Sequence, residues 1–284
     1  MKILFTDDNT QWSRYGYQIA KQMFPDAIIR RKPLKECLEE DRYWDVILYK
    51  NTDITTKLAL KDDPRYVPYE VGQEQWKNNT EILKQKCGLL IDKCEFGRKH
   101  LPLIIPEINP KFRGKHVTSP NCTTIQVAIP LYYIDKQYQI VDAFVSSYQS
   151  WSGCDPQDPR PKHTNIEYIE DEDEKLYNEM HKIFDVGFSL HTHCIRVPTK
   201  HCHGTAISLI TAHAIKELPN IPGVKFEYAD NETAREKPDI YLHNVRKTDI
   251  GVNFFCMTDN TYKGAAYNQL QIAQCYLKNL RKDL

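Results

Sequence analysis

Short apolar runs alternate with longer amphipathic spans through the amino-terminal part of the chain. Runs of this length are typical of buried strands, and the spans between them have the apolar spacing of helices. We predict strands at residues 2–6, 27–30, 45–49, 87–92 and 103–105, and helices at 15–24 and 73–86. The alternation indicates βαβ units around a parallel sheet.

The carboxyl-terminal part mixes strands and helices in a less regular order. We predict strands at residues 140–147, 188–197, 223–228, 239–245 and 252–258, and helices at 175–184, 205–216 and 262–280. A polar, proline-rich loop is expected at 155–164, and a solvated acidic loop at 170–174. The pattern predicts an α/β part followed by an α+β part.

Composition narrows the class of protein. The chain has 284 residues, 41% of them hydrophobic, which is enough to bury one large or two ordinary cores. Its 38 basic and 38 acidic residues cancel, which argues against nucleic acid or an anionic membrane as a partner. The amino terminus turns charged too soon for a signal peptide, and no apolar run could span a bilayer. Nine scattered cysteines are typical of reduced thiols, so we expect a cytoplasmic protein.

The segment Ser119-Pro-Asn-Cys-Thr-Thr-Ile-Gln126 holds the first candidate for chemistry. The Ser-Pro pair interrupts regular structure, and Asn121 is a good N-cap for a helix that follows. Cys122 then lies in the first turn, where unpaired N–H groups and the helix dipole favour a thiolate. Cys122 is therefore a candidate nucleophile, and the alternative is a small buried residue without chemistry.

Histidines and cysteines gather between residues 191 and 203. Strand alternation places His191 and His193 on one face, which would suit a metal ion. The spacing matches no zinc finger, knuckle or ribbon, so we assign no metal ligands. The other interpretation makes Arg196 an anion clamp and His203 an acid/base.

Several motifs, in order, make the chain resemble the aspartate-semialdehyde dehydrogenase family from about Gly88 to its carboxyl terminus. Residues 119–126 look like the active-site cysteine motif of that family, and Ser147-Tyr-Gln-Ser-Trp-Ser-Gly153 is similar to its glutamine segment. The other matching segments are Pro102-Leu-Ile-Ile-Pro-Glu-Ile-Asn109, Glu179-Met-His-Lys182, Cys194-Ile-Arg-Val-Pro-Thr-Lys-His-Cys-His203 and Asp259-Asn-Thr-Tyr-Lys-Gly-Ala-Ala-Tyr-Asn268.

The resemblance implies a role for each matched residue. Cys122 would carry a covalent intermediate, His203 would be the acid/base and Gln149 the active-site glutamine. The implied substrate and phosphate residues are Arg196, Glu179, Lys182, Arg98 and Asn121. Arg196 would hold the substrate carboxylate and Glu179 its ammonium group. Lys182 and Arg98 would bind phosphate.

The resemblance also implies the reaction and the architecture. Cys122 would attack the aldehyde of L-aspartate 4-semialdehyde, and phosphate would release the resulting thioester as L-4-aspartyl phosphate. NADP would be the cofactor, and the protein a homodimer. Residues 1–121 plus 262–284 would form a shortened Rossmann-like, nucleotide-binding-type domain, on which the last helix packs back. Residues 122–261 would form the catalytic and dimerisation domain.

The nucleotide half departs from the family pattern. The Gly-x-x-Gly-x-x-Gly turn expected after the first strand reads Thr6-Asp-Asp-Asn-Thr-Gln-Trp-Ser-Arg-Tyr-Gly16. Side chains therefore stand where the backbone should approach the phosphates. A later Ser-Gly-x-Gly is only half kept, as Ser152-Gly-Cys-Asp155, and the glycine expected before the catalytic histidine is Cys202.

Three residues are the remaining candidates for cofactor contact: Thr6, Gly153 and Asn260. The leading hypothesis is an active, divergent dehydrogenase, because the residues for covalent chemistry occur together. The alternative is a cofactor-deficient relative that uses Cys122 and the substrate pocket for binding, regulation or non-redox acyl chemistry. A third hypothesis is a metal-binding module built on the histidine and cysteine cluster.

Overall fold

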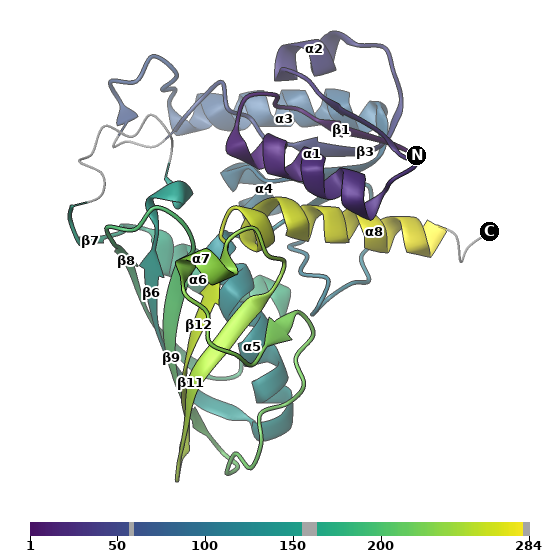
Figure 1. Cartoon of the computed structure of the whole chain (residues 1–284). Helices are drawn as coiled ribbons and strands as arrows, with labels where there is room; N and C mark the ends of the chain where they lie inside the picture. Colours follow the sequence, from purple (N-terminus) through teal and green to yellow (C-terminus); the bar gives the residue numbers. More distant parts are fainter. Residues whose placement is uncertain (57–59, 155–163, 281–284) are drawn as a thin grey trace. The chain divides into compact units, whose positions relative to one another are not determined.

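The structure is a computed structural model that describes residues 1–56, 60–154 and 164–280 (Figure 1). It divides into two compact units. The first unit comprises Met1–Pro106, Pro110–Ser119 and Gln269–Leu284, and the second comprises Glu107–Asn109 and Pro120–Asn268. Each unit has its own sheet, so each is described by itself.

The first unit is built on a parallel five-stranded sheet in the order β2-β1-β3-β4-β5. Its strands are β1 (Lys2–Phe5), β2 (Ile28–Arg31), β3 (Trp44–Tyr49), β4 (Cys87–Asp92) and β5 (His116–Thr118). All six residues of β4 are buried, as expected for an inner strand covered on both faces. The predicted parallel sheet is confirmed.

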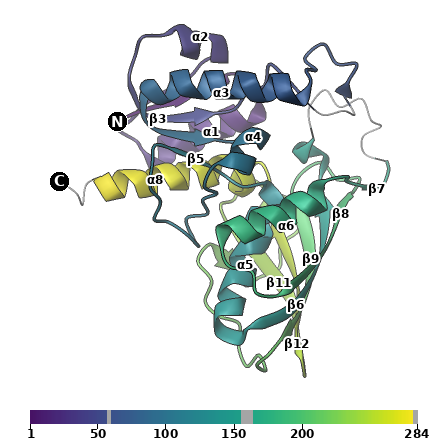
Figure 2. The same ribbon diagram turned by 180° about the vertical axis from the view of Figure 1, so that it is seen from behind.

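Five helices accompany this sheet in the described residues. They are α1 (Gln11–Met23), α2 (Leu34–Glu39), α3 (Tyr69–Gln85), α4 (Glu95–His100) and α8 (Asn268–Leu280). The last helix lies beside the first (Figures 1 and 2), and the Trp12 indole N–H donates to the Gln269 side-chain oxygen over 2.7 Å. The carboxyl-terminal helix therefore returns to the first unit, as predicted.

The predicted strand at 103–105 is wrong. Leu103 makes only an isolated bridge to Thr118, and the fifth strand is β5. Pro102 and Pro106 flank the apolar run and have no N–H to donate, so the run cannot continue a ladder. Its burial made it look like a strand.

The second unit is built on a mixed seven-stranded sheet in the order β10-β11-β12-β9-β6-β8-β7. Its strands are β6 (Ile140–Gln149), β7 (Glu167–Tyr168), β8 (Ser189–Arg196), β9 (His203–Thr211), β10 (Val224–Lys225), β11 (Ile240–Thr248) and β12 (Gly251–Thr258). Neighbours β6 and β8 are parallel, whereas β9 is antiparallel to both β6 and β12.

The helix predicted at 205–216 is wrong, because residues 203–211 form β9 near the middle of the sheet. Thr205, Ile207 and Leu209 are buried, and the residues between them are less so. This period of two is the signature of a strand. Thr205 and Ile207 are also β-branched, which favours strands. A second prediction was too long, since β10 keeps only two residues of the range 223–228.

The helical elements of the second unit are α5 (Cys122–Tyr138), α6 (Glu172–Ile183), α7 (Asn231–Ala234), the 3₁₀ turn η2 (Trp151–Gly153) and the π-helix η3 (Tyr262–Tyr267). Part of the predicted acidic loop is helical, because α6 begins at Glu172. Acidic side chains favour a helix amino terminus. The predicted loop at 155–164 lies outside the described residues except for Thr164. In the described ranges, none of the helices has both the length and the apolar character needed to cross a membrane.

Candidate active site

Cys122 is the first residue of α5, as predicted. Asn121 is the N-cap, and its side-chain oxygen accepts the backbone N–H of Thr123 over 2.8 Å. Cys122 is half-buried. A Cβ added at Gly264 would come within 2.6 Å of the Cys122 Cβ, so only glycine lets η3 lie this close to the thiol.

His203 completes a cysteine–histidine pair. It is fully buried at the start of β9, and its Nε2 lies 3.5 Å from the Cys122 Sγ. Burial, and then the nearby Arg196 guanidinium, lower the pKa of His203 from 6.5 to about 3. The imidazole is therefore neutral at physiological pH. The two side chains come from positions 81 residues apart in the sequence.

Gln149 and Arg196 end two neighbouring strands, β6 and β8, and are partners in the register of that pair. The Gln149 side-chain N–H donates to the Thr123 hydroxyl over 2.9 Å, which connects it to the first turn of α5. Arg196 is buried, donates to the backbone carbonyl of Ser150 over 2.5 Å, and lies over the Trp151 ring. Both predicted residues are thus placed in the second unit with Cys122 and His203.

Glu179 is not a surface residue. It is 5% exposed, and its Oε2 accepts the backbone N–H of Asn121 and the Thr124 hydroxyl, each over 2.7 Å. The Asn121 side-chain amide donates to Glu172 over 2.7 Å. Glu179 and Lys182 lie on the same helix, α6, but the Glu179 carboxylate does not face solvent. The carboxylate lies instead against the residues that begin α5.

Two predicted residues belong to the first unit. Arg98 lies on α4 and donates to the carbonyl of Lys93 over 3.3 Å. The Thr6 hydroxyl both donates to the carbonyl of Lys50 and accepts its N–H, over 3.1 and 3.0 Å. Thr6 thereby extends the pairing of β1 with β3 at the carboxyl ends of these strands.

The turn between β1 and α1 is closed by the chain's own carboxylate. Asp7 is 4% exposed, and its Oδ1 accepts the backbone N–H groups of Asn9 and Thr10 over 2.9 and 3.2 Å. Its Oδ2 accepts the Thr10 hydroxyl, and Thr10 in turn caps the N–H of Ser13. The amino end of α1, where a Rossmann fold receives a diphosphate, already carries a negative charge.

Gly153 lies beside His203, and Asn260 lies beside two serines next to it. A Cβ on Gly153 would come within 3.2 Å of the His203 ring, so this position has little room for a side chain. Asn260 is 3% exposed, and its side-chain oxygen accepts the hydroxyls of Ser152 and Ser150 over 3.0 and 3.3 Å. Sequence reasoning missed Ser150 as a partner of His203, because one serine in a turn has no distinguishing pattern.

A second missed feature is the pair of Lys263 and Glu107. Lys263 is fully buried in η3, and its ammonium group contacts the Glu107 carboxylate. Both residues lie in segments that matched the family, but the match gave no sign of their contact. A lysine among small residues in the run Lys263-Gly-Ala-Ala266 could have indicated burial with a partner.

The histidine and cysteine cluster is divided by strand alternation. His191 and His193 share one face of β8, as predicted, and are exposed, whereas Cys194 points to the buried side. Within residues 1–56, 60–154 and 164–280, no three His, Cys, Asp or Glu side chains are grouped so that they could hold a metal ion.

Comparison with known proteins indicates the family to which this chain belongs. No family model matches the chain. The aspartate-semialdehyde dehydrogenase of Shewanella sp. (strain DB6705) is 31% identical, with 72% of this chain and 76% of the relative covered. The chain belongs to the aspartate-semialdehyde dehydrogenase family. The predicted resemblance is therefore confirmed.

Solved structures of the same enzyme share the fold. Aspartate semialdehyde dehydrogenase II complexed with ASA from Vibrio cholerae has a TM-score of 0.75 at 18% identity, with 98% of both chains covered. The Candida albicans enzyme with NADP has a TM-score of 0.66 at 14% identity, covering 96% of this chain and 97% of that one. The predicted combination of a Rossmann-like part and a catalytic part is the fold of this family.

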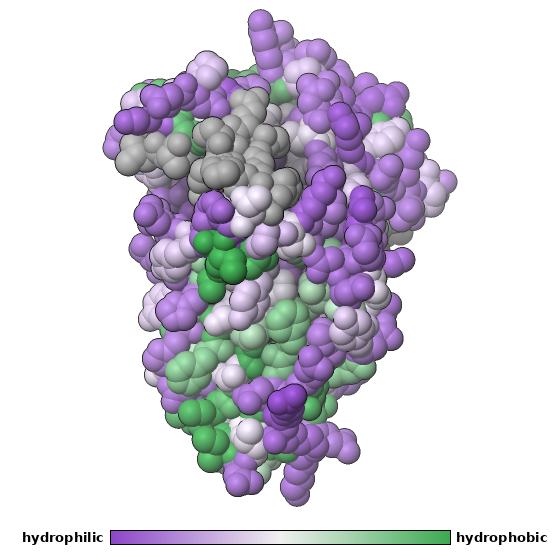
Figure 3. All heavy atoms as spheres, turned by 60° about the vertical axis from the view of Figure 1, so that its left-hand side comes forward, coloured by the Kyte–Doolittle hydropathy of each residue, from purple (hydrophilic) through white to green (hydrophobic). Residues whose placement is uncertain are grey.

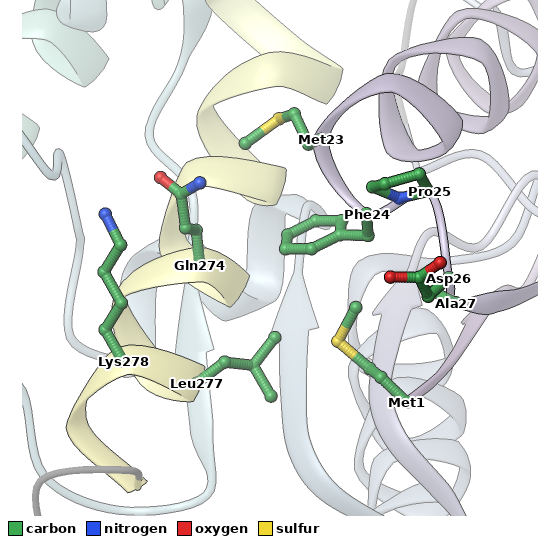
Figure 4. Close-up of a pocket in the computed structure, with 9 residues that line it drawn as sticks. All are labelled: Met1, Met23, Phe24, Pro25, Asp26, Ala27, Gln274, Leu277 and Lys278. Carbon is green, nitrogen blue, oxygen red and sulfur yellow. The ribbon is translucent and has the colours of Figure 1, made fainter.

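The first unit also has a hollow of its own. It measures about 370 Å³ and lies in the first unit between the end of α1 and α8 (Figure 4). Met1 lines it, so it lies at the amino end of β1, whereas open parallel sheets bind ligands at the carboxyl ends of their strands. It has no part in the site around Cys122.

Proposed function

We propose that this protein is an NADP-dependent, phosphorylating aldehyde dehydrogenase that interconverts L-aspartate 4-semialdehyde plus phosphate and L-4-aspartyl phosphate. Family membership supports the reaction. The single observation that carries it is the Cys122–His203 pair, 3.5 Å apart at the start of α5. A thiol at a helix amino terminus beside an imidazole is the arrangement of an activated nucleophile.

The chemistry begins with attack of the Cys122 thiolate on the aldehyde carbon, which gives a thiohemiacetal. Gln149 lies by the first turn of α5 and orients the carbonyl for this attack. His203 is the acid/base that gives a proton to the oxygen of the new hydroxyl group and can take it back. A bound NADP would supply the hydride acceptor that leaves a thioester on Cys122, and phosphate would then take the acyl group and free the Cys122 thiolate.

The polar residues around this pair divide the work of binding. Arg196 binds the substrate carboxylate as a planar fork, and Glu179 binds the substrate ammonium group. Asn121 also contacts the substrate, and Lys182 and Arg98 bind phosphate. Partners of this kind are small molecules, and the balanced charge gives no support for a nucleic acid or membrane partner.

NADP is the hydride acceptor that we propose, and its binding differs from that of a glycine-rich fold. The residues at the amino end of α1 do not fit a diphosphate, because Asp7 already accepts the N–H groups of Asn9 and Thr10. Thr6, Gly153 and Asn260 are the candidate contacts elsewhere.

A homodimer is supported by the outer face of the second sheet. Figure 3 shows apolar side chains gathered on the part of the surface formed by the second unit. Phe144, which is 45% exposed, stacks on His191, and Tyr148 lies near Phe255, whose ring contacts His243. Exposed aromatic rings on adjoining strands are typical of an interface. Phe144→Asp should convert a dimer into monomers in analytical ultracentrifugation, and a monomeric wild type would contradict the proposal.

None of the nine cysteines, all within the described residues, forms a disulfide, which supports a reducing compartment and hence the cytoplasm. Fractionation of cells carrying a tagged full-length chain would test this location.

The activity is tested by phosphate-dependent reduction of NADP by aspartate semialdehyde. We expect turnover by the wild type and none by Cys122→Ala, because no other side chain replaces the thiol. Cys275→Ala, which changes a half-buried cysteine on α8, is the matched control and should keep its activity. Turnover by Cys122→Ala would refute the covalent mechanism. Silence in folded wild type that still alkylates at Cys122 would favour a cofactor-deficient relative.

A further inference from the structure

A chain of hydrogen bonds leads from His203 away from Cys122. The Nδ1 of His203 contacts the Ser150 hydroxyl at 3.2 Å, and this hydroxyl contacts that of Ser152 at 2.8 Å. His203 and Ser150 are fully buried, whereas Ser152 is half-buried. The chain therefore connects the catalytic imidazole to the edge of the site through two hydroxyls, each of which can donate and accept.

The backbone of Ser150 decides where the resting imidazole carries its proton. The Ser150 N–H donates to the Nδ1 of His203 over 3.1 Å. A backbone N–H can only donate, so Nδ1 is an acceptor and has no proton. A neutral imidazole then carries its proton on Nε2, directed toward the Cys122 Sγ. In this form His203 donates to its partner and cannot accept a proton at Nε2.

A resting donor of this kind poses a difficulty for simple acid catalysis. Loss of the Nε2 proton from a neutral imidazole would leave an anion unless Nδ1 gains a proton at the same time. The alternative route through a charged imidazolium is disfavoured, because burial and Arg196 lower the pKa of His203 to about 3. A donor at Nδ1 resolves the difficulty, and the Ser150 hydroxyl is in place to be one.

We propose that His203 acts as a relay between its two neutral tautomers, with Ser150 and Ser152 as positioning residues that pass the proton to and from solvent. This proposal rests on the proposed function of the site. Ser150 and Ser152 touch the histidine and each other, and they act through it.

The step is balanced when the thiohemiacetal forms. The Cys122 sulfur forms a bond to the aldehyde carbon, and the π pair of the carbonyl moves to oxygen. That oxygen takes the Nε2 proton, Nδ1 takes the Ser150 hydroxyl proton, Ser150 takes that of Ser152, and Ser152 takes one from solvent water. One proton enters from solvent to neutralise the charge that the thiolate brought. The imidazole ends as the Nδ1–H tautomer.

Asn260 keeps the hydroxyls able to turn. Its side-chain oxygen lies within hydrogen-bonding distance of both, at 3.3 Å from Ser150 and 3.0 Å from Ser152. When Nδ1 carries the proton and donates to the Ser150 oxygen, the Ser150 hydroxyl can donate to Asn260 instead. The Nδ1–H form faces the Ser150 N–H, so it readily returns the proton to the site.

The resting tautomer is tested by nitrogen NMR of protein labelled in its histidine rings. His203→Gln assigns the His203 signals. We expect a neutral ring with the proton on Nε2, in the wild type and in Ser150→Ala, because the variant keeps the backbone N–H. A resting ring protonated on Nδ1, or charged at neutral pH, would overturn the proposal whether or not the protein turns over.

Addition of aspartate semialdehyde, without phosphate or nucleotide, tests the relay itself. We expect the proton to move to Nδ1 in the wild type and not in Ser150→Ala, and the same movement in both would overturn the relay. Protection of Cys122 from iodoacetamide reports whether the aldehyde binds. Absence of protection in the wild type would refute the proposed function, and the resting spectrum would still judge the tautomer.

Turnover gives the second measurement. We expect Ser150→Ala to lower kcat by roughly tenfold, with KM little changed, since relayed protons contribute part of acid–base catalysis. The number of protons inferred from rates in mixtures of light and heavy water should also fall. Ser147→Ala is the matched control, because its buried hydroxyl has no hydrogen-bond partner among the described residues. Equal kcat values in wild type and Ser150→Ala would overturn the proposal.

Discussion

The amino termini of α1 and α5 differ in the chemical group that lies against them. At α1, the N-cap is Thr10, and Asp7 accepts its N–H and that of Asn9, so a carboxylate of the chain closes the turn before the helix. At α5, a neutral residue, Asn121, is the cap, and a thiol stands directly after it. The same dipole stabilises a built-in anion in the first case and favours a reactive thiolate in the second.

The difference teaches that the turn before a helix decides what its amino terminus can bind. A glycine-rich turn leaves the N–H groups to a ligand, whereas an aspartate in the same place accepts them itself. In the catalytic unit, the amino terminus of α5 stays available to the Cys122 thiol. In the other unit, N–H groups of the turn before α1 bond to a carboxylate of the chain.

The largest expected effect concerns pH and the buried histidine of the catalytic unit. His203 titrates near 6.5 when unfolded and near 3 when folded, so the unfolded state binds more protons between these values. Stability should therefore fall as pH drops from 6.5 toward 3, by a few kcal/mol. His203→Gln should flatten this slope in urea titrations, whereas His193→Gln, at an exposed position on β8, should not. Equal slopes in all three proteins would contradict the neutral, buried state.

Arg196→Lys comes next and tests whether the catalytic unit binds a carboxylate. A lysine keeps the charge but loses the planar fork that matches two oxygens. We expect kcat/KM to fall by about 100-fold, close to 2.7 kcal/mol, mainly through KM. Steady-state kinetics with varied aspartate semialdehyde would measure it. A change in kcat alone would mean that Arg196 acts on His203 and not on the substrate.

Asp7→Gly would convert the first helix terminus into something closer to a ligand site. The substitution removes one negative charge and frees two N–H groups. NADPH should therefore bind about tenfold more tightly. The fold should lose about 1 kcal/mol, because the N–H groups of Asn9 and Thr10 lose their acceptor within the chain. Fluorescence titration and thermal unfolding would give both values. Asp8→Gly, one residue along, is the control, and equal gains in both variants would indicate only a general charge effect.

The smallest expected effect is at Cys202, directly before His203. Its φ of 66° lies in the left-handed region, where glycine is unstrained and other residues are not. Cys202 packs against Tyr241 and donates its thiol to the carbonyl of Asn231, so truncation loses contacts in any case. We expect Cys202→Gly to be more stable than Cys202→Ala by about 1 kcal/mol in denaturant titrations. The reverse order would show that the backbone there is not strained.

Sequence alone was sufficient where structure depends on neighbours along the chain. The cap at Asn121 and the start of α5 follow from four consecutive residues, and β4 was predicted at its observed bounds. By contrast, residues 205–216 have apolar spacings that also suit a helix. Pairing with β6 and β12 decides that 203–211 form a strand, and those partners are distant in sequence.

The site follows the same division. Family motifs indicated Cys122, Gln149, Arg196 and His203, and the structure places these four within one unit. The burial of Glu179 and the contact of Lys263 with Glu107 depend on packing between distant segments, which no local pattern reports. The sequence shows the charge of Asp7 in the first turn. It does not show that Asp7 accepts the N–H groups of Asn9 and Thr10.

The close approach of Gly264 to Cys122 has a stereochemical consequence. One side of the cysteine is covered by η3, and the Nε2 of His203 stands 3.5 Å from the sulfur. An aldehyde that reaches the thiol must turn its oxygen toward the imidazole and keep its chain away from the helix. We therefore expect the new tetrahedral carbon to form with a single handedness, its hydrogen pointing to one side only.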